Sequence, residues 1–390
     1  MMRSLLMLAL FTFACSSDDS TPASTAGGGG GVGGAADSGV GGSGAASGGS
    51  GGVSAAAGAG GASGAPGVPG VRFIGRVDQT EAGVTKFAWS GSGAAFRFEG
   101  TEASVTLDDS ARFFTLLVDG TPSLLTTSKG KQTYTLATGL SAGTHEVRLY
   151  RRTEASFGTT AFYEVTLAGG TLLPPPPPPG RRIEVIGDSI TCGYGNEGAD
   201  ENCNFSADTE NHYLTYAAIS AREVNADLTT VAWSGKGIVY NYGDDKTDPL
   251  PALYDRILPG SASSQWGFGW QPDVVLINLG TNDYSTDDDP SPSLFTAEYE
   301  KFLLHLRSKY PSASILALVP TLLGGNDLAQ AKAAIESAVA ARAAAGDSNV
   351  EAFALSFQQS GWGCDYHPSL ATHASMAQAL TAKLKSLKGW

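Results

Sequence analysis

The chain has 390 residues, with 25 Lys and Arg against 38 Asp and Glu, which gives a net charge of −13. At roughly 100–200 residues for each domain, this length predicts two or three domains. An apolar fraction of 42% and a mean hydropathy of −0.05 exclude a polytopic membrane protein. The acidic balance disfavours binding through clustered Lys and Arg, so no nucleic-acid partner is expected.

The N-terminal residues are typical of an export signal. Arg3 precedes a short apolar run, Leu5–Phe13, which only Ala14 separates from Cys15. The charge and the length predict a secretory signal peptide over residues 1–15, because a membrane span would need about 20 apolar residues. Cys15, right after the apolar region, predicts a bacterial cell-surface or outer-membrane lipoprotein. Thr12 stands where such signals usually carry Leu, so ordinary secretion is the alternative.

Two segments of biased composition divide the rest of the chain. Residues 16–70 are nearly all Gly, Ala and Ser, which cannot bury enough apolar surface to fold, so a disordered tether is predicted. Residues 174–180 are six prolines closed by Gly180, which predicts a stiff polyproline II linker. Two folded domains are therefore expected, at 71–173 and 181–390.

The first of these domains consists of short β-rich runs. Several alternate in polarity, and turn signals such as Asp119-Gly120 and Lys129-Gly130 fit hairpins. This pattern predicts a β-sandwich of jelly-roll type. Its role is that of a lid or spacer, with independent carbohydrate binding as the alternative. The runs are Val71–Val77, Ala95–Phe98, Ala103–Leu107, Phe113–Val118, Thr133–Leu136, His145–Arg151 and Ala161–Leu167.

After the prolines, continuous apolar strands alternate with amphipathic helices. That alternation predicts an α/β domain with a parallel sheet covered on both faces. Helices are expected over Leu294–Tyr310, over Leu328–Ala345 and after Pro368. The last helix would place His373 on its apolar seam with Ala377, Leu380, Leu384 and Leu387. The predicted strands are Ile183–Ile186, Leu228–Trp233, Val274–Leu279, Ile315–Val319 and Val350–Ala354.

The chain directly after the first of these strands carries a candidate nucleophile. Ligands of parallel sheets gather at the carboxyl ends of the strands, and Ser189 lies there, within Gly187–Gly195. A Ser on the turn from strand to helix presents its hydroxyl at the sheet edge. Taken alone, the pair Asp188-Ser189 would be read as a helix cap.

Further short motifs follow the later strands. Together with Gly187-Asp188-Ser189-Ile190, the runs Ser234-Gly235-Lys236-Gly237, Gly280-Thr281-Asn282-Asp283 and Asp365-Tyr366-His367-Pro368 resemble the four blocks of SGNH hydrolases. The longer runs Gly187–Gly195 and Gly363–Ser369 are similar to one branch, carbohydrate esterase family two. The resemblance spans about 71–390 and implies a β-sandwich before the hydrolase domain.

In this resemblance Ser189 is the nucleophile and His367 the base. A serine hydroxyl is a poor nucleophile unless a base takes its proton. Most SGNH hydrolases have two residues between the Asp and the His of the last block, whereas only Tyr366 separates Asp365 from His367 here; this spacing is known within family two. Asp365 is expected to be the third catalytic residue, whose carboxylate orients the imidazole, with a main-chain carbonyl as the alternative.

The same blocks supply an expected oxyanion hole. Asn282 offers a side-chain N–H, and Ser189 and Gly235 offer main-chain N–H groups. Each such donor is worth on the order of 3 kcal/mol in the transition state. This chemistry needs no cofactor.

Aromatic residues near the blocks favour a carbohydrate substrate. Trp233, Tyr240, Tyr242 and Trp362 lie beside them, and the C–H faces of sugars pack on aromatic rings. Core packing is the alternative for each ring. The family resemblance makes Tyr242 the expected sugar platform. Trp233 and Trp362 are expected as further binding residues because of their places beside the blocks.

The remaining Cys, His and Asp residues predict no metal site. Cys192, Cys203 and Cys364 allow one disulfide and one free thiol, in three alternative pairings. They show neither Cys-x-x-Cys nor His-x-x-x-His spacing. The acidic run 287–289 is read as a solvated loop, because it lacks the Gly and Glu of a calcium loop. No role is assigned to the other histidines, His145, His212, His305 and the packed His373.

Together these features predict a monomeric, exported serine esterase that removes acetyl groups from xylan, glucomannan or related oligosaccharides. One alternative is another SGNH esterase, such as a lipase or thioesterase, which would want an apolar acyl pocket. The other is a non-catalytic carbohydrate-binding surface lipoprotein. A pure binder has no use for Ser189, Gly235, Asn282 and His367, which argues against that alternative.

Overall fold

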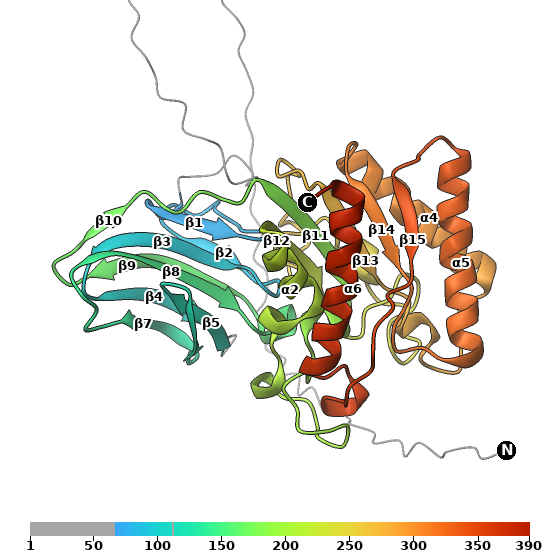
Figure 1. Cartoon of the computed structure of the whole chain (residues 1–390), viewed down its shortest axis with the longest axis horizontal. Coiled ribbons are helices and arrows are strands. Elements are labelled where there is room, and N and C mark those ends of the chain that lie inside the picture. Colours follow the sequence, from blue (N-terminus) through green and yellow to red (C-terminus); the bar gives the residue numbers. More distant parts are fainter. Residues whose placement is uncertain (1–66, 111–112) are drawn as a thin grey trace, which may run out of the picture. The chain divides into compact units, whose positions relative to one another are not determined.

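The computed structural model describes residues 67–110 and 113–390 (Figure 1). The predicted signal peptide, Cys15 and the tether as far as residue 66 lie outside the described residues. Among the helices of the described part, none is both long and apolar enough to cross a lipid bilayer.

The first domain is built from ten strands. They are β1 Val71–Ile74, β2 Thr85–Phe87, β3 Gly93–Gly100, β4 Ala103–Asp109, β5 Phe113–Val118, β6 Thr121–Thr126, β7 Gly130–Ala137, β8 Gly143–Arg151, β9 Thr160–Leu167 and β10 Thr171–Leu173, with a 3₁₀ turn, η1, at Ala155–Phe157. One sheet has the order β1-β3-β8-β5-β6 with β10 paired to β3, and the other has the order β2-β9-β4-β7. All pairings are antiparallel, as expected for a β-sandwich.

The two sheets share one apolar core. Phe73 of the first sheet meets Phe162 of the second edge to face, with 5.3 Å between ring centroids. Along β8 buried and half-buried side chains alternate from His145 to Arg151, as in a strand with one face on a core. Six of the seven predicted runs lie within strands, and the seventh, Val71–Val77, extends three residues beyond the end of β1. The sequence missed β2 and β10, which have three residues each, and β6, whose side chains are mostly exposed.

The polyproline run follows β10. Residues 174–179 contain neither helix nor strand, and the carbonyl of Pro174 accepts a hydrogen bond from Arg97 Nε at 3.0 Å. Polyproline II geometry and the domain boundary at this run stay predictions.

The second domain alternates strands and helices. Its elements are β11 Arg181–Gly187, α1 Ser189–Cys192, η2 Ala207–Thr209, η3 His212–Leu214, α2 Tyr216–Glu223, β12 Ala226–Ala232, α3 Leu250–Leu253, β13 Val274–Asn278, η4 Asn282–Tyr284, α4 Pro292–Lys309, β14 Ser314–Leu318, α5 Gly325–Ala344, β15 Val350–Phe353, η5 Cys364–Tyr366 and α6 Leu370–Lys388. The five strands form one parallel sheet in the order β12-β11-β13-β14-β15. This is the predicted α/β architecture.

Helices cover both faces of this sheet (Figure 1). Along β13, Val274 and Leu276 belong to a core with α2 and α6, while Val275 and Ile277 belong to a core with α4 and α5. Successive side chains of a strand point to opposite faces, so a strand buried on both faces reads as a continuous apolar run. His373 is fully buried on α6, as its place on the apolar seam predicted.

The central strands end at the same level. Gly187, the last residue of β11, pairs with Ala232 of β12 and with Asn278 of β13. The loops that follow these three strands therefore start beside one another. They carry Ser189, Gly235 and Asn282.

Side chains of the sandwich also contact the α/β domain. Arg76 is fully buried and donates to Glu184 of β11 at 2.9 Å, and the hydroxyl of Tyr254 donates to the same carboxylate at 2.6 Å. Nearer the surface, Arg72 of β1 pairs with Asp227 of β12 at 3.2 Å. A buried charge is tolerated only when it is paired in this way.

Candidate active site

Ser189 is the first residue of α1, directly after β11. The carboxylate of Asp188 caps this helix by accepting a hydrogen bond from the N–H of Ile190 at 3.1 Å. Burial raises the pKa of Asp188 to about 7. Both interpretations of the pair Asp188-Ser189 therefore apply. Asp188 caps the helix and fixes the turn, and Ser189 faces the histidine.

The hydroxyl of Ser189 is hydrogen-bonded to His367. Its Oγ lies 2.8 Å from His367 Nε2, although 178 residues separate the two in sequence. The other ring nitrogen, Nδ1, lies 3.0 Å from the main-chain carbonyl of Asp365. A carbonyl can only accept, so Nδ1 carries the hydrogen and Nε2 is left free to accept from the serine.

Burial lowers the pKa of His367 below its usual value of 6.5, and the nearby Asp365 and Cys364 oppose this shift. A lowered pKa keeps the imidazole neutral at and below neutral pH. Only the neutral ring can take the serine proton.

The Asp365 carboxylate does not orient His367, contrary to the expectation from the sequence. The side chain accepts from the hydroxyl of Tyr194 at 2.9 Å and from the N–H of Phe205 at 3.1 Å. Within the described residues no hydrogen bond joins it to the imidazole. Asp365 and Tyr366 both have left-handed backbone, with φ of 52° and 59°. This tight turn leaves the carbonyl of Asp365, rather than its carboxylate, on the side of the ring.

A disulfide holds the histidine loop. Of the three pairings left open by the sequence, the structure has Cys203–Cys364, while Cys192 is a buried free thiol. The N–H of Cys364 also donates to Gly195 O at 2.9 Å. The loop that carries His367 is thereby tied to the loop that follows Ser189.

The Gly235 loop offers a main-chain donor. Gly235 has φ of +79°, a backbone conformation that favours glycine. In the part of the chain that the structure describes, its N–H has no hydrogen-bond acceptor, whereas Trp233 N–H donates to Gly187 O at 3.3 Å and Lys236 N–H to Trp233 O at 3.2 Å. A free N–H on a fixed loop is the feature that an oxyanion hole requires.

Asn282 and Asp283 fix the same loop from η4. Asn282 Nδ2 donates to Lys236 O at 2.9 Å, which leaves its second N–H for another acceptor. The Asp283 carboxylate accepts main-chain N–H bonds from Ile238, Val239 and Tyr240 at 2.7–2.9 Å. The sequence predicted Asn282 and not Asp283.

The predicted aromatic binding residues differ in exposure. Tyr242 is 63% exposed, and its N–H donates to Gly235 O at 2.8 Å, so an open ring stands beside the Gly235 loop. Trp362 is half-buried and packs edge to face on Tyr366, with 6.0 Å between centroids. Trp233 is half-buried and packs against the apolar core, as its alternative interpretation expected.

Tyr194 is a site residue that the sequence reasoning missed. Its ring lies 4.2 Å from that of His367 and stacks on Phe205 at 3.8 Å. Tyr194 belongs to the run Gly187–Gly195. Its place between two glycines, shortly after the nucleophile, could have indicated a role in the site.

The histidines without an assigned role are bound elsewhere. His145 contacts Asp119 at 2.7 Å, and His305 contacts Asp255 at 2.7 Å. The buried His212 and His373 bond to Thr230 Oγ1 at 2.9 Å and to the N–H of Tyr216 at 3.3 Å. None of them faces Ser189 through a hydrogen bond in the described residues.

A serine bonded to a histidine, at the carboxyl ends of parallel strands and beside a free main-chain N–H, defines a serine hydrolase of the α/β class. Comparison with known families agrees. Residues 73–177 match the family described as Carbohydrate esterase 2 N-terminal, and residues 185–374 match the GDSL-like Lipase/Acylhydrolase family.

Individual relatives narrow the class further. A family two carbohydrate esterase from Clostridium thermocellum, solved in complex with cellohexaose, is 39% identical and superposes with a TM-score of 0.80 over 82% of this chain and 100% of that chain. The chain therefore belongs to carbohydrate esterase family two.

Two curated relatives are enzymes. Cellulase/esterase CelE of Acetivibrio thermocellus is 40% identical over 326 residues, which are 81% of this chain and 39% of CelE. The chain thus spans well under half the length of CelE. An acetylxylan esterase / glucomannan deacetylase of Cellvibrio japonicus is 29% identical over 276 residues, 69% of this chain and 74% of that protein.

Proposed function

We propose that this protein is a serine esterase that hydrolyses acetyl esters on carbohydrate through an acetyl-enzyme. The observation that carries the proposal is the 2.8 Å hydrogen bond between Ser189 Oγ and His367 Nε2. The free N–H of Gly235 and the second N–H of Asn282 support it, because an ester carbonyl needs donors as it becomes an oxyanion.

In the acylation step, Ser189 Oγ attacks the acetyl carbonyl while Nε2 of His367 takes the serine proton. The new C–O bond makes a tetrahedral intermediate, whose negative oxygen the N–H groups of Ser189, Gly235 and Asn282 stabilise. The intermediate collapses by breaking the bond to the sugar oxygen, which receives the proton from His367. The acetyl group is then on Ser189.

In the deacylation step, water replaces the sugar. His367 takes a proton from the water as it attacks the acetyl carbonyl, and returns it to Ser189 Oγ when the second intermediate collapses. Acetate leaves, and the free serine is restored. During both steps the main-chain carbonyl of Asp365 holds Nδ1–H and so keeps the ring oriented.

The substrate class is proposed from the relatives and from the exposed aromatic ring. The names of the relatives include acetylxylan esterase and glucomannan deacetylase, and one was solved with cellohexaose. Tyr242, 63% exposed beside the Gly235 loop, is proposed to stack on a sugar ring, with Trp362 as a second contact. Acetylated xylan, glucomannan and their oligomers fit this arrangement.

Acetate release tests the proposal. Acetylated xylan, acetylated glucomannan and an aryl acetate are incubated side by side with the wild-type protein and with Ser189→Ala. We expect acetate from the polysaccharides with the wild type only. A long-chain aryl ester serves as the control substrate, and a preference for it over the acetate would favour a lipase or thioesterase instead.

We also propose that the protein is exported, is anchored at the cell surface by a lipid on Cys15, and acts as a monomer. The apolar run Leu5–Phe13, which only Ala14 separates from Cys15, supports the anchor. Mass spectrometry of the mature protein should find a lipid-modified Cys15 at its N-terminus. A mature chain that begins downstream of Cys15 would mean simple secretion, and light scattering of the soluble domains tests the monomer.

A further inference from the structure

We propose that Glu154, a residue of the sandwich half of the chain, is a positioning residue for the oxyanion hole. Its carboxylate holds the N–H of Ser234 and thereby fixes the adjacent N–H of Gly235 toward the reacting carbonyl. The inference rests on the proposed esterase function and adds a role for the N-terminal domain in catalysis.

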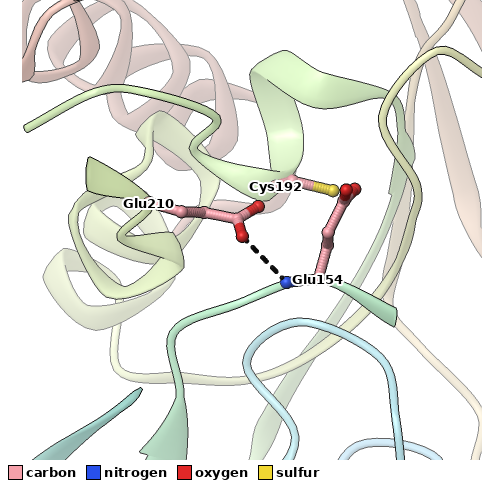
Figure 2. Close-up of side chains that lie close together, drawn as sticks. All are labelled: Glu154, Cys192 and Glu210. Carbon is pink, nitrogen blue, oxygen red and sulfur yellow. Dashed lines mark hydrogen bonds between the residues drawn. The ribbon is translucent and has the colours of Figure 1, made fainter. Parts of the chain in front are cut away.

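The contacts of Glu154 are short and buried. Oε2 accepts from the N–H of Ser234 at 2.6 Å, and Oε1 accepts from Ser156 Oγ at 2.7 Å. The main-chain N–H of Glu154 donates to Glu210 Oε2 at 3.1 Å (Figure 2). Glu154 is 4% exposed and Glu210 is fully buried. The carboxylate therefore has little freedom to move away from the loop.

The hydrogen bond from Ser234 to Glu154 can affect Gly235 because the two residues are adjacent in the loop. Ser234 stands between Trp233, whose N–H continues the bonding of β12 to Gly187 of β11, and Gly235, whose N–H has no acceptor in the described chain. A hydrogen bond to a carboxylate is about twice as strong as one between neutral groups. The bond from Ser234 to Glu154 therefore limits rotation of the peptide units on either side of it.

The ionisable neighbours of Glu154 add no further negative charge beside its carboxylate. Burial raises the pKa of the Glu210 carboxyl and of the Cys192 thiol well above their usual ranges, which opposes a second negative charge beside Glu154. Arg151 interacts electrostatically with Glu154, and its Nη2 also donates to the main-chain carbonyl of Glu154 at 2.7 Å.

The same three side chains could be read as metal ligands. Glu154, Cys192 and Glu210 bring potential ligand atoms within 4.8 Å of one another. Metal binding requires that the thiol and the carboxyl lose their protons, which burial here opposes. Both oxygens of Glu154 also already accept hydrogen bonds, from Ser156 and Ser234. The geometry is thus better suited to holding the loop than to holding an ion.

Substitutions of Glu154 test the inference by separating the length of the side chain from its charge. Glu154→Ala removes the acceptor, Glu154→Asp keeps the charge but is one methylene too short, and Glu154→Gln keeps an oxygen at full reach. The matched control is Arg72→Met, which removes a sandwich contact to β12, the strand that precedes Ser234. It does so at Asp227, near the opposite end of the strand from Ser234.

The measurements are kcat and KM for an aryl acetate, the pH profile of kcat/KM, the melting temperature and the bound metal by elemental analysis. Displacing an oxyanion donor by about 1 Å can cost on the order of 10²-fold. We expect kcat of Glu154→Ala to fall about ten- to a hundredfold, with KM within about twofold. Glu154→Gln should recover to within about fivefold of the wild type and exceed Glu154→Asp. The pH midpoint, which reports His367, should not move, and Arg72→Met should keep its kcat.

Several outcomes would overturn the inference. They are an unchanged kcat in Glu154→Ala, an equal loss in Arg72→Met, a shifted pH midpoint, or a stoichiometric metal that Glu154→Ala loses. If Glu154→Ala does not fold, the order of Gln above Asp decides, and the reverse order refutes positioning. A wild-type protein without esterase activity would overturn the proposed function as well, whereas a fully active Glu154→Ala would overturn this inference alone.

Discussion

Asp365→Asn changes the side chain beside His367 without changing the main-chain carbonyl that faces it. The Nδ1 of His367 lies 3.0 Å from Asp365 O, which the substitution retains. Asn also keeps an oxygen that can accept from Tyr194 and from the N–H of Phe205, the two donors to the present carboxylate. What is lost is one negative charge near the imidazolium that forms during the reaction.

The size of that loss follows from the exposure of the carboxylate. Asp365 lies at the surface, where a charge interaction is worth about 0.5–1 kcal/mol. Since 1.4 kcal/mol corresponds to tenfold, kcat/KM should fall about two- to fivefold. A carboxylate that itself held the histidine tautomer would cost about 10⁴-fold when changed to Asn.

Initial rates on an aryl acetate, over a range of pH and with circular dichroism as the check on folding, distinguish the two cases. Ser189→Ala supplies the background rate. A loss above a hundredfold in a folded Asp365→Asn protein would refute the reasoning, because it would mean that the carboxylate and not the carbonyl orients the ring.

Other substitutions and conditions test the remaining roles. Ser189→Ala should lose more than 10³-fold in kcat with an unchanged melting temperature, and residual activity above about 1% would disprove its role as nucleophile. Asn282→Ala should lower kcat by roughly 10²–10³ with a small change in KM; an unchanged rate would mean that the oxyanion is held elsewhere. Tyr242→Ala should weaken activity on acetylated oligosaccharides more than on an aryl acetate, and equal losses would indicate a structural ring. Because burial lowers the pKa of His367, kcat/KM should rise with pH and level off with a midpoint below 6.5, and a midpoint above about 7 would contradict the buried base.

The sequence predicted the two-domain fold because its signals are local and strong. The strands of the α/β domain are continuous apolar runs, and several strands of the sandwich alternate in polarity with a period of two residues. The missed strand β6 has mostly exposed side chains, so no apolar pattern marks it. The short β2 and β10, with three residues each, are below the length at which a period can be recognised.

The site was predicted where single residues carry the chemistry and missed where the main chain does. Ser189, Asn282 and His367 stand in recognisable motifs. The orientation of His367 depends on two successive residues with left-handed backbone, Asp365 and Tyr366. Neither residue type predicts this backbone conformation. The disulfide Cys203–Cys364 joins residues 161 apart, and only the fold selects it from the three pairings.

The role proposed for Glu154 could not be predicted from the sequence either, because it also depends on a main-chain group. Glu154 lies in the sandwich sequence, far from every motif of the hydrolase, and its contact is to a main-chain N–H. Every residue except proline has a main-chain N–H, so such a donor leaves no residue type in the partner to recognise. Such a contact is found from the structure alone.

The central claim, that an acetyl group passes through Ser189, can be measured directly. Wild-type, Ser189→Ala and His367→Ala proteins are each mixed separately with an acetylated oligosaccharide, quenched in acid and digested for peptide mass spectrometry. We expect one acetyl group on the peptide that contains Ser189 in rapidly quenched wild-type protein, and none in Ser189→Ala or His367→Ala, since without the base the serine is not acylated. Release of acetate by the wild type with no acetyl group on that peptide at any quench time, or with the acetyl group on another residue, would contradict the account.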